Sequence, residues 1–340
     1  MTSKIVVNNI EADAGVSTVT FASNISAPTF VGNLNTTSGV ITARTITGVS
    51  TAGITTAYIG SINDGPISGA RNRIINGDMR VDQRNSGVST TVSTTSVGAY
   101  TLDRWNAASA PSLGAATVIR SGTAPVGFTS SLLWTTTTAS GTLTGSQFAC
   151  VNQVIEGYNT SDLSWGTANA KSVTLSFWVR CSLTGTFSGS IRNFAGTRGY
   201  IFTYTINTQN TFEYKTITIP GDTAGTWTID NTGSIQLSFS LGTGPNYSTT
   251  AGSWQAGNLL ATTGETQVIN NLNATWYLTG VQLEAGTVAT PFERRSYGQE
   301  LALCQRYYEI SATNSPGTGA SHWSGRVTGS TYARQAVSYK

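Results

Sequence analysis

The chain of 340 residues has few charged side chains, one histidine and three cysteines. Asp, Glu, Lys and Arg together make up 10% of it, against roughly 25% in ordinary soluble domains. Ser, Thr, Gly and Asn fill the polar positions instead. Thr suits strands, and Gly, Asn and Ser suit tight turns, so this polar but weakly charged composition favours a protein rich in β-structure.

The basic and acidic residues are spread along the chain and give a formal net charge of only +3. A nucleic-acid-binding protein would instead concentrate its basic residues in a patch. No segment approaches the 18 apolar residues of a membrane-spanning helix, and no basic start is followed by the apolar run of a signal peptide. We therefore expect no nucleic acid partner, no membrane insertion and no signal peptide.

Residues for catalysis and metal binding are also scarce. Cys150, Cys181 and Cys304 have neither CxxC nor zinc-site spacing, so we interpret them as buried apolar side chains. The single His322 has no recognisable triad around it, and no phosphate-binding loop is present. Glycoside hydrolysis needs two carboxylates, but no spacing singles out a pair. We expect no enzyme activity and no cofactor.

The distribution of aromatic residues places a domain boundary near residue 70. All eight Trp residues lie between Trp105 and Trp323, and residues 1–70 contain only three aromatics. This first region repeats short Gly, Val, Ile and Thr segments without helical periodicity. Because it has too few large side chains to form its own core, it is either a flexible linker or an intertwined β shaft that winds with copies of itself. We predict the shaft.

Residues 71–295 have the pattern of a β-sandwich. Apolar and polar residues alternate over 173–180 and over 235–241, as in strands with one face in a core. Trp276 and Leu278 share a face that Val281 and Leu283 continue if Gly280 marks a bulge.

A short helix and a distal segment follow the predicted sandwich. Ser296 and Gln299 have the spacing of a capping box, which predicts a helix within the linker 296–310. Tyr297, Leu301, Cys304 and Tyr308 form an apolar seam that either docks on the sandwich or on symmetry mates. Residues 311–340 have the pattern of an incomplete β extension.

Several motifs together resemble the central domain of a family of phage tail fibre proteins. They are RNRIINGDMRVDQR at 71–84, YTLDRW at 100–105, CVNQVIEG at 150–157, LSWGTA at 163–168, VTLSFWVR at 173–180, TITIP at 216–220 and TGVQLEAGTVATPFE at 279–293. The resemblance covers residues 71 to about 309. It implies a jelly roll similar to carbohydrate-binding modules.

Pattern and resemblance together predict an all-β protein with an N-terminal intertwined β shaft (1–70), a jelly-roll sandwich (71–295), one short helix and the start of a C-terminal β region. The resemblance implies the function of a tail fibre structural protein and host-receptor adhesin in the virion tail, made in the host cytoplasm. We expect a homotrimer that binds other tail or baseplate proteins through its N-terminal region and host cell-surface polysaccharide through the jelly roll. The alternatives are a purely structural baseplate or fibre-shaft component and a polysaccharide-degrading tailspike.

Four acids, Asp78, Asp103, Glu156 and Glu284, fall within the motifs. Jelly rolls of the carbohydrate-binding type often carry a structural calcium, which would here be bound by Asp78 and Glu284. We favour the alternative, in which Asp103 and Glu284 form ion pairs with Arg73, Arg80 or Arg104, and we expect no metal.

The candidate ligand-binding residues lie in the polar segment 242–257. Trp105, Trp178 and Trp276 fall on predicted strands and are interpreted as packing residues. Trp254 and Tyr247 instead lie among Gly, Ser, Thr and Asn, where exposed rings suit stacking on sugars. We predict that they bind glycan, with Asn246 or Gln255 as hydrogen-bonding partners. In the competing interpretation Trp254 folds back onto the sandwich.

Overall fold

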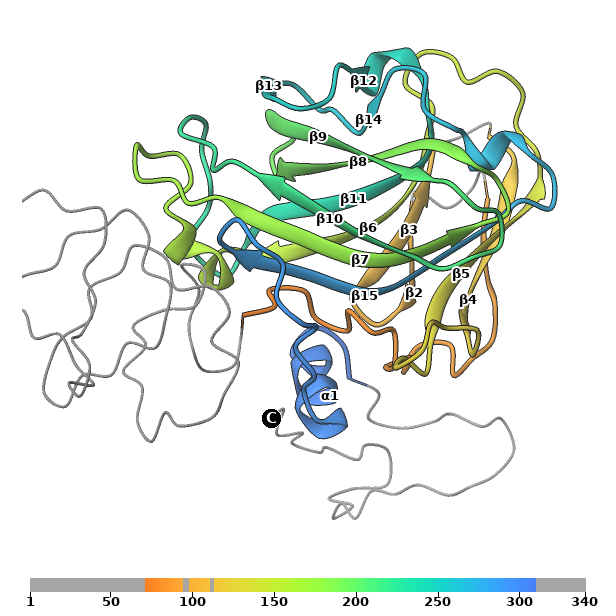
Figure 1. The fold of residues 1–340 in the computed structure, drawn as a ribbon, viewed down its shortest axis with the longest axis horizontal. Helices are drawn as coiled ribbons and strands as arrows, with labels where there is room; N and C mark the ends of the chain where they lie inside the picture. Colours follow the sequence, from red (N-terminus) through yellow and green to blue (C-terminus); the bar gives the residue numbers. More distant parts are fainter. Residues whose placement is uncertain (1–70, 94–97, 111–112, 310–340) are drawn as a thin grey trace, which may run out of the picture. The chain divides into compact units, whose positions relative to one another are not determined.

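The computed structural model describes residues 71–93, 98–110 and 113–309, which all belong to one compact unit. These residues form two antiparallel β-sheets and one α-helix (Figure 1). The predicted shaft (1–70) and the predicted distal extension (311–340) lie outside the described residues.

The first sheet has six strands and the second has seven. In spatial order the six are β1 (Thr90–Val92), β4 (Ala115–Ser121), β5 (Ser131–Thr138), β15 (Thr275–Ala285), β7 (Val173–Cys181) and β10 (Glu213–Ile219). The seven are β13 (Trp254–Ala256), β9 (Arg198–Ile206), β8 (Gly185–Asn193), β11 (Gly233–Thr243), β6 (Phe148–Glu156), β3 (Trp105–Ser109) and β2 (Ala99–Leu102). Successive strands repeatedly change sheet, as in a jelly roll, so the predicted all-β sandwich is confirmed.

Smaller elements connect these strands. A parallel pair, β12 (Ser248–Thr249) and β14 (Ala261–Thr262), lies beside the seven-stranded sheet. The short 3-10 helices are η1 (Gly157–Asn159), η2 (Ser161–Leu163), η3 (Pro245–Tyr247) and η4 (Val268–Asn270). The α-helix is α1 (Tyr297–Gln305).

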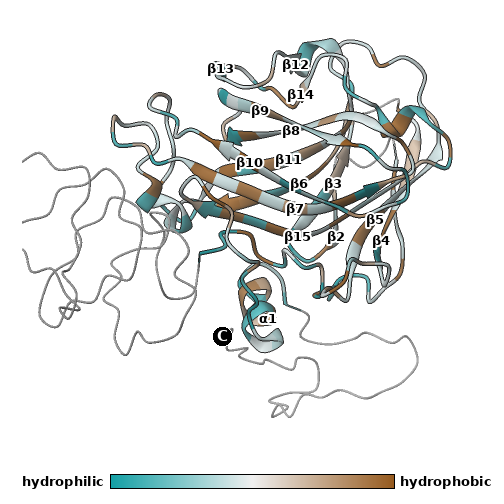
Figure 2. Ribbon diagram, in the orientation of Figure 1, coloured by the Kyte–Doolittle hydropathy of each residue, from teal (hydrophilic) through white to brown (hydrophobic). Residues whose placement is uncertain are grey.

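The core lies between the sheets, and the alternating strands predicted it. Apolar and polar residues alternate along β7 (Figure 2), and its Phe177 packs against Phe239 of β11 in the opposite sheet, with ring centroids 5.0 Å apart. Trp105 and Trp276 are fully buried, as expected for packing residues, whereas Trp178 is half-buried against Tyr214 on the outer face of the six-stranded sheet. All three cysteines are free and buried, as predicted.

Gly280 forms the predicted bulge in β15. Its φ of 61° is the left-handed region that favours glycine, and the register with β7 shifts between Thr279 and Gln282. The bulge turns the Val281 N–H out of the ladder to donate to the Gly77 carbonyl at 2.9 Å. Gly77 approaches so closely that an added Cβ would lie 2.2 Å from the Val281 oxygen. The bulge therefore anchors the segment that precedes β1.

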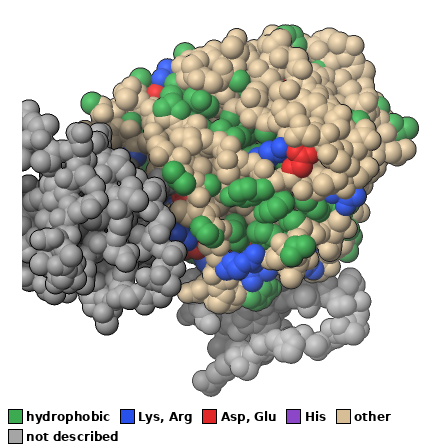
Figure 3. All heavy atoms as spheres, viewed as in Figure 1, with side chains coloured by type: hydrophobic (Ala, Val, Ile, Leu, Met, Phe, Trp, Pro, Cys, Tyr) green, Lys and Arg blue, Asp and Glu red, His purple; other side chains and the backbone are tan. Residues whose placement is uncertain are grey.

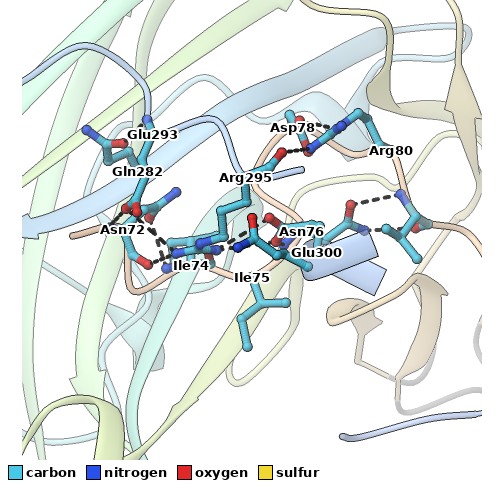
Figure 4. Close-up of polar contacts among 12 residues, drawn as sticks. Asn72, Ile74, Ile75, Asn76, Asp78, Arg80, Gln282, Glu293, Arg295 and Glu300 are labelled. Carbon is cyan, nitrogen blue, oxygen red and sulfur yellow. Dashed lines mark hydrogen bonds and ion pairs between the residues drawn. The ribbon is translucent and has the colours of Figure 1, made fainter. Parts of the chain in front are cut away.

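This N-terminal segment, residues 71–80, is fastened by buried polar contacts (Figure 4). The Asn72 side chain donates to the Val281 carbonyl at 3.0 Å and accepts from the Leu283 N–H at 3.1 Å. The Asn76 N–H donates to the Glu300 carboxylate of α1 at 2.5 Å. Residues 71–80 therefore connect strand β15 to helix α1.

Helix α1 docks on its own chain, the first of the two alternatives for its apolar seam. Ser296 and Gln299 form the predicted capping box. Cys304 is buried against Ile75 and Val81, whereas Tyr297 at the start of the seam is exposed. Among the described residues no helix is long and apolar enough to cross a membrane.

Helix α1 lies below the sandwich in the view of Figure 1. Hydrogen bonds to the Glu156 carboxylate also hold the end of this helix against the sandwich. Glu156, at the end of β6, accepts from Arg306 at 2.6 Å and from the Tyr307 hydroxyl at 2.7 Å. The hydrogen bond from Arg306 is the main cause that lowers the pKa of Glu156. The segment after Ser296 therefore belongs to the sandwich and is no free linker over the described residues.

Candidate functional site

A groove of about 310 Å³ lies on the outward face of the seven-stranded sheet. Strand alternation produces it, because Val151 and Ile155 of β6 point into the core while Asn152 and Val154 between them line the groove. The full lining consists of Tyr100, Asn106, Ala108, Phe148, Cys150, Asn152, Val154, Arg192, Phe194, Gln236, Tyr247, Asn258 and Leu260.

Sheet register aligns the polar lining residues in two rows across the strands. Tyr100 pairs with Asn106, and Asn106 pairs with Asn152. Gln236 of β11 pairs with Val154 on one side and with Arg192 on the other. Because directly paired residues on one face have neighbouring side chains, the first row is polar throughout, and the second is polar at Gln236 and Arg192.

Much of the hydrogen-bonding capacity of these rows is unused. The amide groups of Asn106 and Asn258 make no hydrogen bond within the described residues, and Asn152 contacts only the Cys150 sulfur, at 3.6 Å. Gln236 accepts one bond from Arg192, at 2.9 Å. Each side-chain amide has two donor hydrogens and an acceptor oxygen, so the groove offers donors and acceptors to a ligand.

Aromatic rings supply flat apolar surface beside these amides. Tyr100 on β2 is 44% exposed and Phe194, after β8, is 54% exposed. Tyr247 of η3 packs edge-on against Phe148, with ring centroids 5.8 Å apart. None of the lining residues is an acid, and Arg192 is the one charged residue among them.

The structure separates the four residues predicted to bind glycan. Tyr247 lines the groove. Its neighbour Asn246 donates from its amide to Ser146 at 2.9 Å. Gln255 is held by Thr249 and by the carbonyl of Thr250. Neither Asn246 nor Gln255 lines the groove, so the segment 242–257 is not one continuous site; their binding role remains a prediction.

The expectation that Trp254 is an exposed ring in a loop is wrong. Trp254 lies in edge strand β13, is half-buried, and donates from its indole N–H to the Pro220 carbonyl at 2.7 Å. Its ring makes edge contacts with Trp165 and Trp227 at centroid distances of 5.3 and 5.6 Å. The competing interpretation, in which Trp254 folds back onto the sandwich, describes its position.

The acids within the motifs have structural partners. Asp78 forms an ion pair with Arg80, and both carboxylate oxygens of Glu284 accept from Thr290. The calcium alternative at Asp78 and Glu284 stays a prediction; within the described residues there is no cluster of three or more His, Cys, Asp or Glu side chains that could hold a metal.

The predicted ion pairs of Asp103 and Glu284 are also wrong. Asp103 accepts from the Gln83 side chain at 2.5 Å, and burial is the main cause that raises its pKa. Arg73 pairs instead with Asp162, and Arg104 lies over the ring of Tyr307. Arginines of the 71–84 motif do form ion pairs within the domain, Arg73 with the remote Asp162 and Arg80 with the neighbouring Asp78.

The outer face of the six-stranded sheet has a different character from the groove. Hydrophobic side chains gather over β7 and β15 in Figure 3. An open, shallow depression there is lined mainly by apolar and aromatic residues, among them Phe128, Trp178 and Phe292. Free amides alternating with exposed rings occur on the seven-stranded sheet, which makes its groove the candidate site.

Comparisons with known proteins give only weak likenesses. No family model matches the chain, and no curated protein matches it significantly. Among solved structures, the enzymatically active domain of bacteriophage CBA120 tailspike protein 4 is 14% identical over 63% of this chain and 21% of that chain, with a TM-score of 0.33. The matched region thus spans about a fifth of the tailspike chain.

Two carbohydrate-binding modules are also similar. The family 11 module from Clostridium thermocellum, solved with a mixed-linked tetrasaccharide, is 14% identical over 57% of this chain and 99% of its own, with a TM-score of 0.29. TmCBM61, solved with β-1,4-galactotriose, is 10% identical over 53% of this chain and 88% of its own, with a TM-score of 0.27. Identities and scores this low transfer neither ligand nor activity to this chain.

Proposed function

We propose that this protein is a phage tail fibre component and host-receptor adhesin that binds cell-surface glycan, without catalysis, in the groove of the seven-stranded sheet. The observation that carries the proposal is the pattern of free amides and exposed rings on one sheet face. A sugar presents hydroxyl groups along its edge and C–H groups on its faces. The hydroxyl groups can bond to the amides of Asn106, Asn152 and Asn258. The C–H faces can stack on the rings of Tyr100 and Phe194.

The composition of the groove favours binding over hydrolysis. A glycosidase of the usual kind places two carboxylates about 5–9.5 Å apart around the bond that it cleaves. The lining residues include no carboxylate, so the groove as described offers neither a general acid nor a nucleophile of that kind. A polysaccharide-degrading tailspike would need to cleave elsewhere on the molecule.

Multivalency would make a weak groove sufficient. A shallow, solvent-exposed saccharide site has an affinity near millimolar, or about −4 kcal/mol. In a homotrimer, joined through residues 1–70 and attached by them to other tail or baseplate proteins, three grooves would add on the order of 10² to 10⁴ in avidity. Mass measurement of the full chain under native conditions tests the trimer, and a monodisperse monomer at micromolar concentration would contradict it.

The binding role of the groove can be tested with two tyrosines of equal exposure. Tyr100 in the groove and Tyr214 on the six-stranded sheet are both 44% exposed. Tyr100→Ala should weaken adsorption to host polysaccharide about fivefold per site, because a stacked ring contributes about 1 kcal/mol, whereas Tyr214→Ala should leave adsorption unchanged. Equal adsorption of the two variants would exclude this groove. Failure of the parent protein to bind any host glycan would favour a purely structural baseplate or fibre-shaft component.

A further inference from the structure

The one charged side chain of the groove is unusual in its surroundings. Arg192 is half-buried on β8, and its Nε is closed off from solvent without a hydrogen bond. Within the described residues its guanidinium makes a single side-chain hydrogen bond, to the neutral Gln236 amide at 2.9 Å. A guanidinium has five N–H donors, so most of its donor capacity is unused.

Other arginines of the domain show how this fold normally satisfies a buried guanidinium. Six arginines have a buried Nε without a hydrogen bond: Arg73, Arg80, Arg84, Arg104, Arg180 and Arg192. The first two pair with carboxylates of Asp162 and Asp78. The next three lie over aromatic rings of Tyr308, Tyr307 and Tyr277, within 5 Å of each centroid. Arg192 is the member of this set with neither an acid nor a ring as partner.

The desolvated Arg192 cation lowers the stability of the folded protein. Burial is the main cause that lowers the pKa of Arg192, and burial also raises the pKa of the neighbouring Cys150 thiol, so that thiol supplies no counter-charge. A desolvated charge without a counter-charge destabilises a fold unless something else pairs with it.

Glu265, an acid on this sheet face, has other partners than Arg192. Glu265 accepts hydrogen bonds from Ser188 and Ser240. Ser188 lies four residues before Arg192 on β8, which is about 13 Å along a strand. The groove around Arg192 is lined by no acid, and the amides of Gln236 and Asn258 are among its lining groups.

We propose that the groove binds an acidic saccharide, with the carboxylate of a uronic-acid-type sugar held by the Arg192 guanidinium. The planar guanidinium matches a carboxylate in a two-point hydrogen bond, and the bound anion would supply the missing counter-charge. The neighbouring amides would bind hydroxyl groups of the same sugar or of the next one. This inference rests on the proposed glycan binding and specifies the class of glycan.

The experiment uses an array of bacterial polysaccharides on which every acidic polysaccharide is printed beside its carboxyl-reduced, neutral form. The full-length parent protein should bind acidic members and lose at least tenfold in binding on their reduced forms. Equal binding to both forms, or binding to neutral polysaccharides alone, would overturn the acidic specificity while leaving glycan binding intact. Binding to no member would count against glycan binding itself, and the inference would fall with it.

Three variants assign the specificity to Arg192. Arg192→Gln should weaken binding to the acidic form about 10- to 100-fold and to the neutral form much less, because a hydrogen bond between charged groups is lost only with the acidic form. Arg192→Lys keeps the charge without the planar fork and should retain part of the binding. Arg120→Gln makes the same charge change at the exposed position of β4 and should bind like the parent.

Salt dependence and melting temperature separate a binding defect from misfolding. Raising the ionic strength should weaken binding of the parent to the acidic form more than binding of Arg192→Gln, because only the parent forms the ion pair. Arg192→Gln should melt at or above the temperature of the parent, since it removes an uncompensated buried charge. If this variant folds and still binds the acidic form like the parent, Arg192 is not the anion site.

Discussion

The free energy of unfolding should fall as the pH rises from about 4.5 to about 8, because of Glu265. Replacing Glu265 with Gln should abolish this fall. Glu265 lies between β14 and η4 and is 8% exposed. Its carboxyl group accepts from the hydroxyls of Ser188 on β8 and Ser240 on β11, the latter at 2.5 Å. Burial raises its pKa from 4.5 to about 7, although both serine hydrogen bonds act to lower it.

The direction follows from the protons bound in each state. Between pH 4.5 and about 7 the folded protein keeps Glu265 protonated while the unfolded chain releases this proton, so stability falls as the pH rises. The difference of about 2.5 pKa units corresponds to about 3 kcal/mol, because one unit is about 1.4 kcal/mol. Above about pH 8 the loss is complete. Gln does not titrate, and its amide can still accept from Ser188 and donate to Ser240.

Urea unfolding of parent and variant at a series of pH values measures this effect as a difference between two free-energy curves. A matched control is Glu213→Gln. Burial acts to raise the pKa of Glu213, but hydrogen bonds from Lys215 and from the N–H groups of Thr208 and Asn207 outweigh it and lower the pKa to about 2. The stabilisation by Glu213 is therefore lost only below pH 4.5, and its variant should keep the slope of the parent between 4.5 and 8. An unchanged slope in Glu265→Gln would refute the reasoning.

Two further predictions concern the core and its aromatic edge. Phe239→Ala should lower the free energy of unfolding by roughly 3–5 kcal/mol and the melting temperature by roughly 6–20 °C, because the fully buried ring contacts Phe177, Phe202 and Trp276. A calorimetric loss below about 1 kcal/mol would contradict this packing. Trp254→Ala should lower the melting temperature and leave adsorption to host cells per folded molecule unchanged, since the ring lies against Trp165 and Trp227. Normal melting with lost adsorption would restore the sugar-stacking interpretation.

Local patterns were enough to predict the regular elements. Alternation predicted β7 and β11, the interrupted alternation around Gly280 predicted the bulge, and the spacing of Ser296 and Gln299 predicted the helix start. Each of these patterns involves residues that are close in sequence, because strand alternation and helix capping are local effects. Sequence reasoning is strongest for such features.

The site depends on pairing between remote strands, which a single sequence does not reveal. Asn106 meets Asn152, and Arg192 meets Gln236, only because β3, β6, β11 and β8 adopt this order and register. The groove residues could have been sought among the outward-facing positions of the predicted strands, such as Gln236 between Ile235 and Leu237. Trp254 was misplaced for a similar reason, because its polar neighbours suggested a loop while pairing with β9 makes it part of an edge strand.

The scarcity of charge gives Arg192 more influence on a ligand than it would have on an ordinary surface. Most acids of the described domain are held by internal partners, as Glu156 is by Arg306 and Asp222 is by Arg198. Few free carboxylates therefore remain near the groove to offset its cation, whose field is screened by solvent and salt. A neutral sheet face with a single unpaired guanidinium can bind hydroxyl-rich chains broadly and still prefer the acidic ones, because amides supply contact and the cation supplies discrimination.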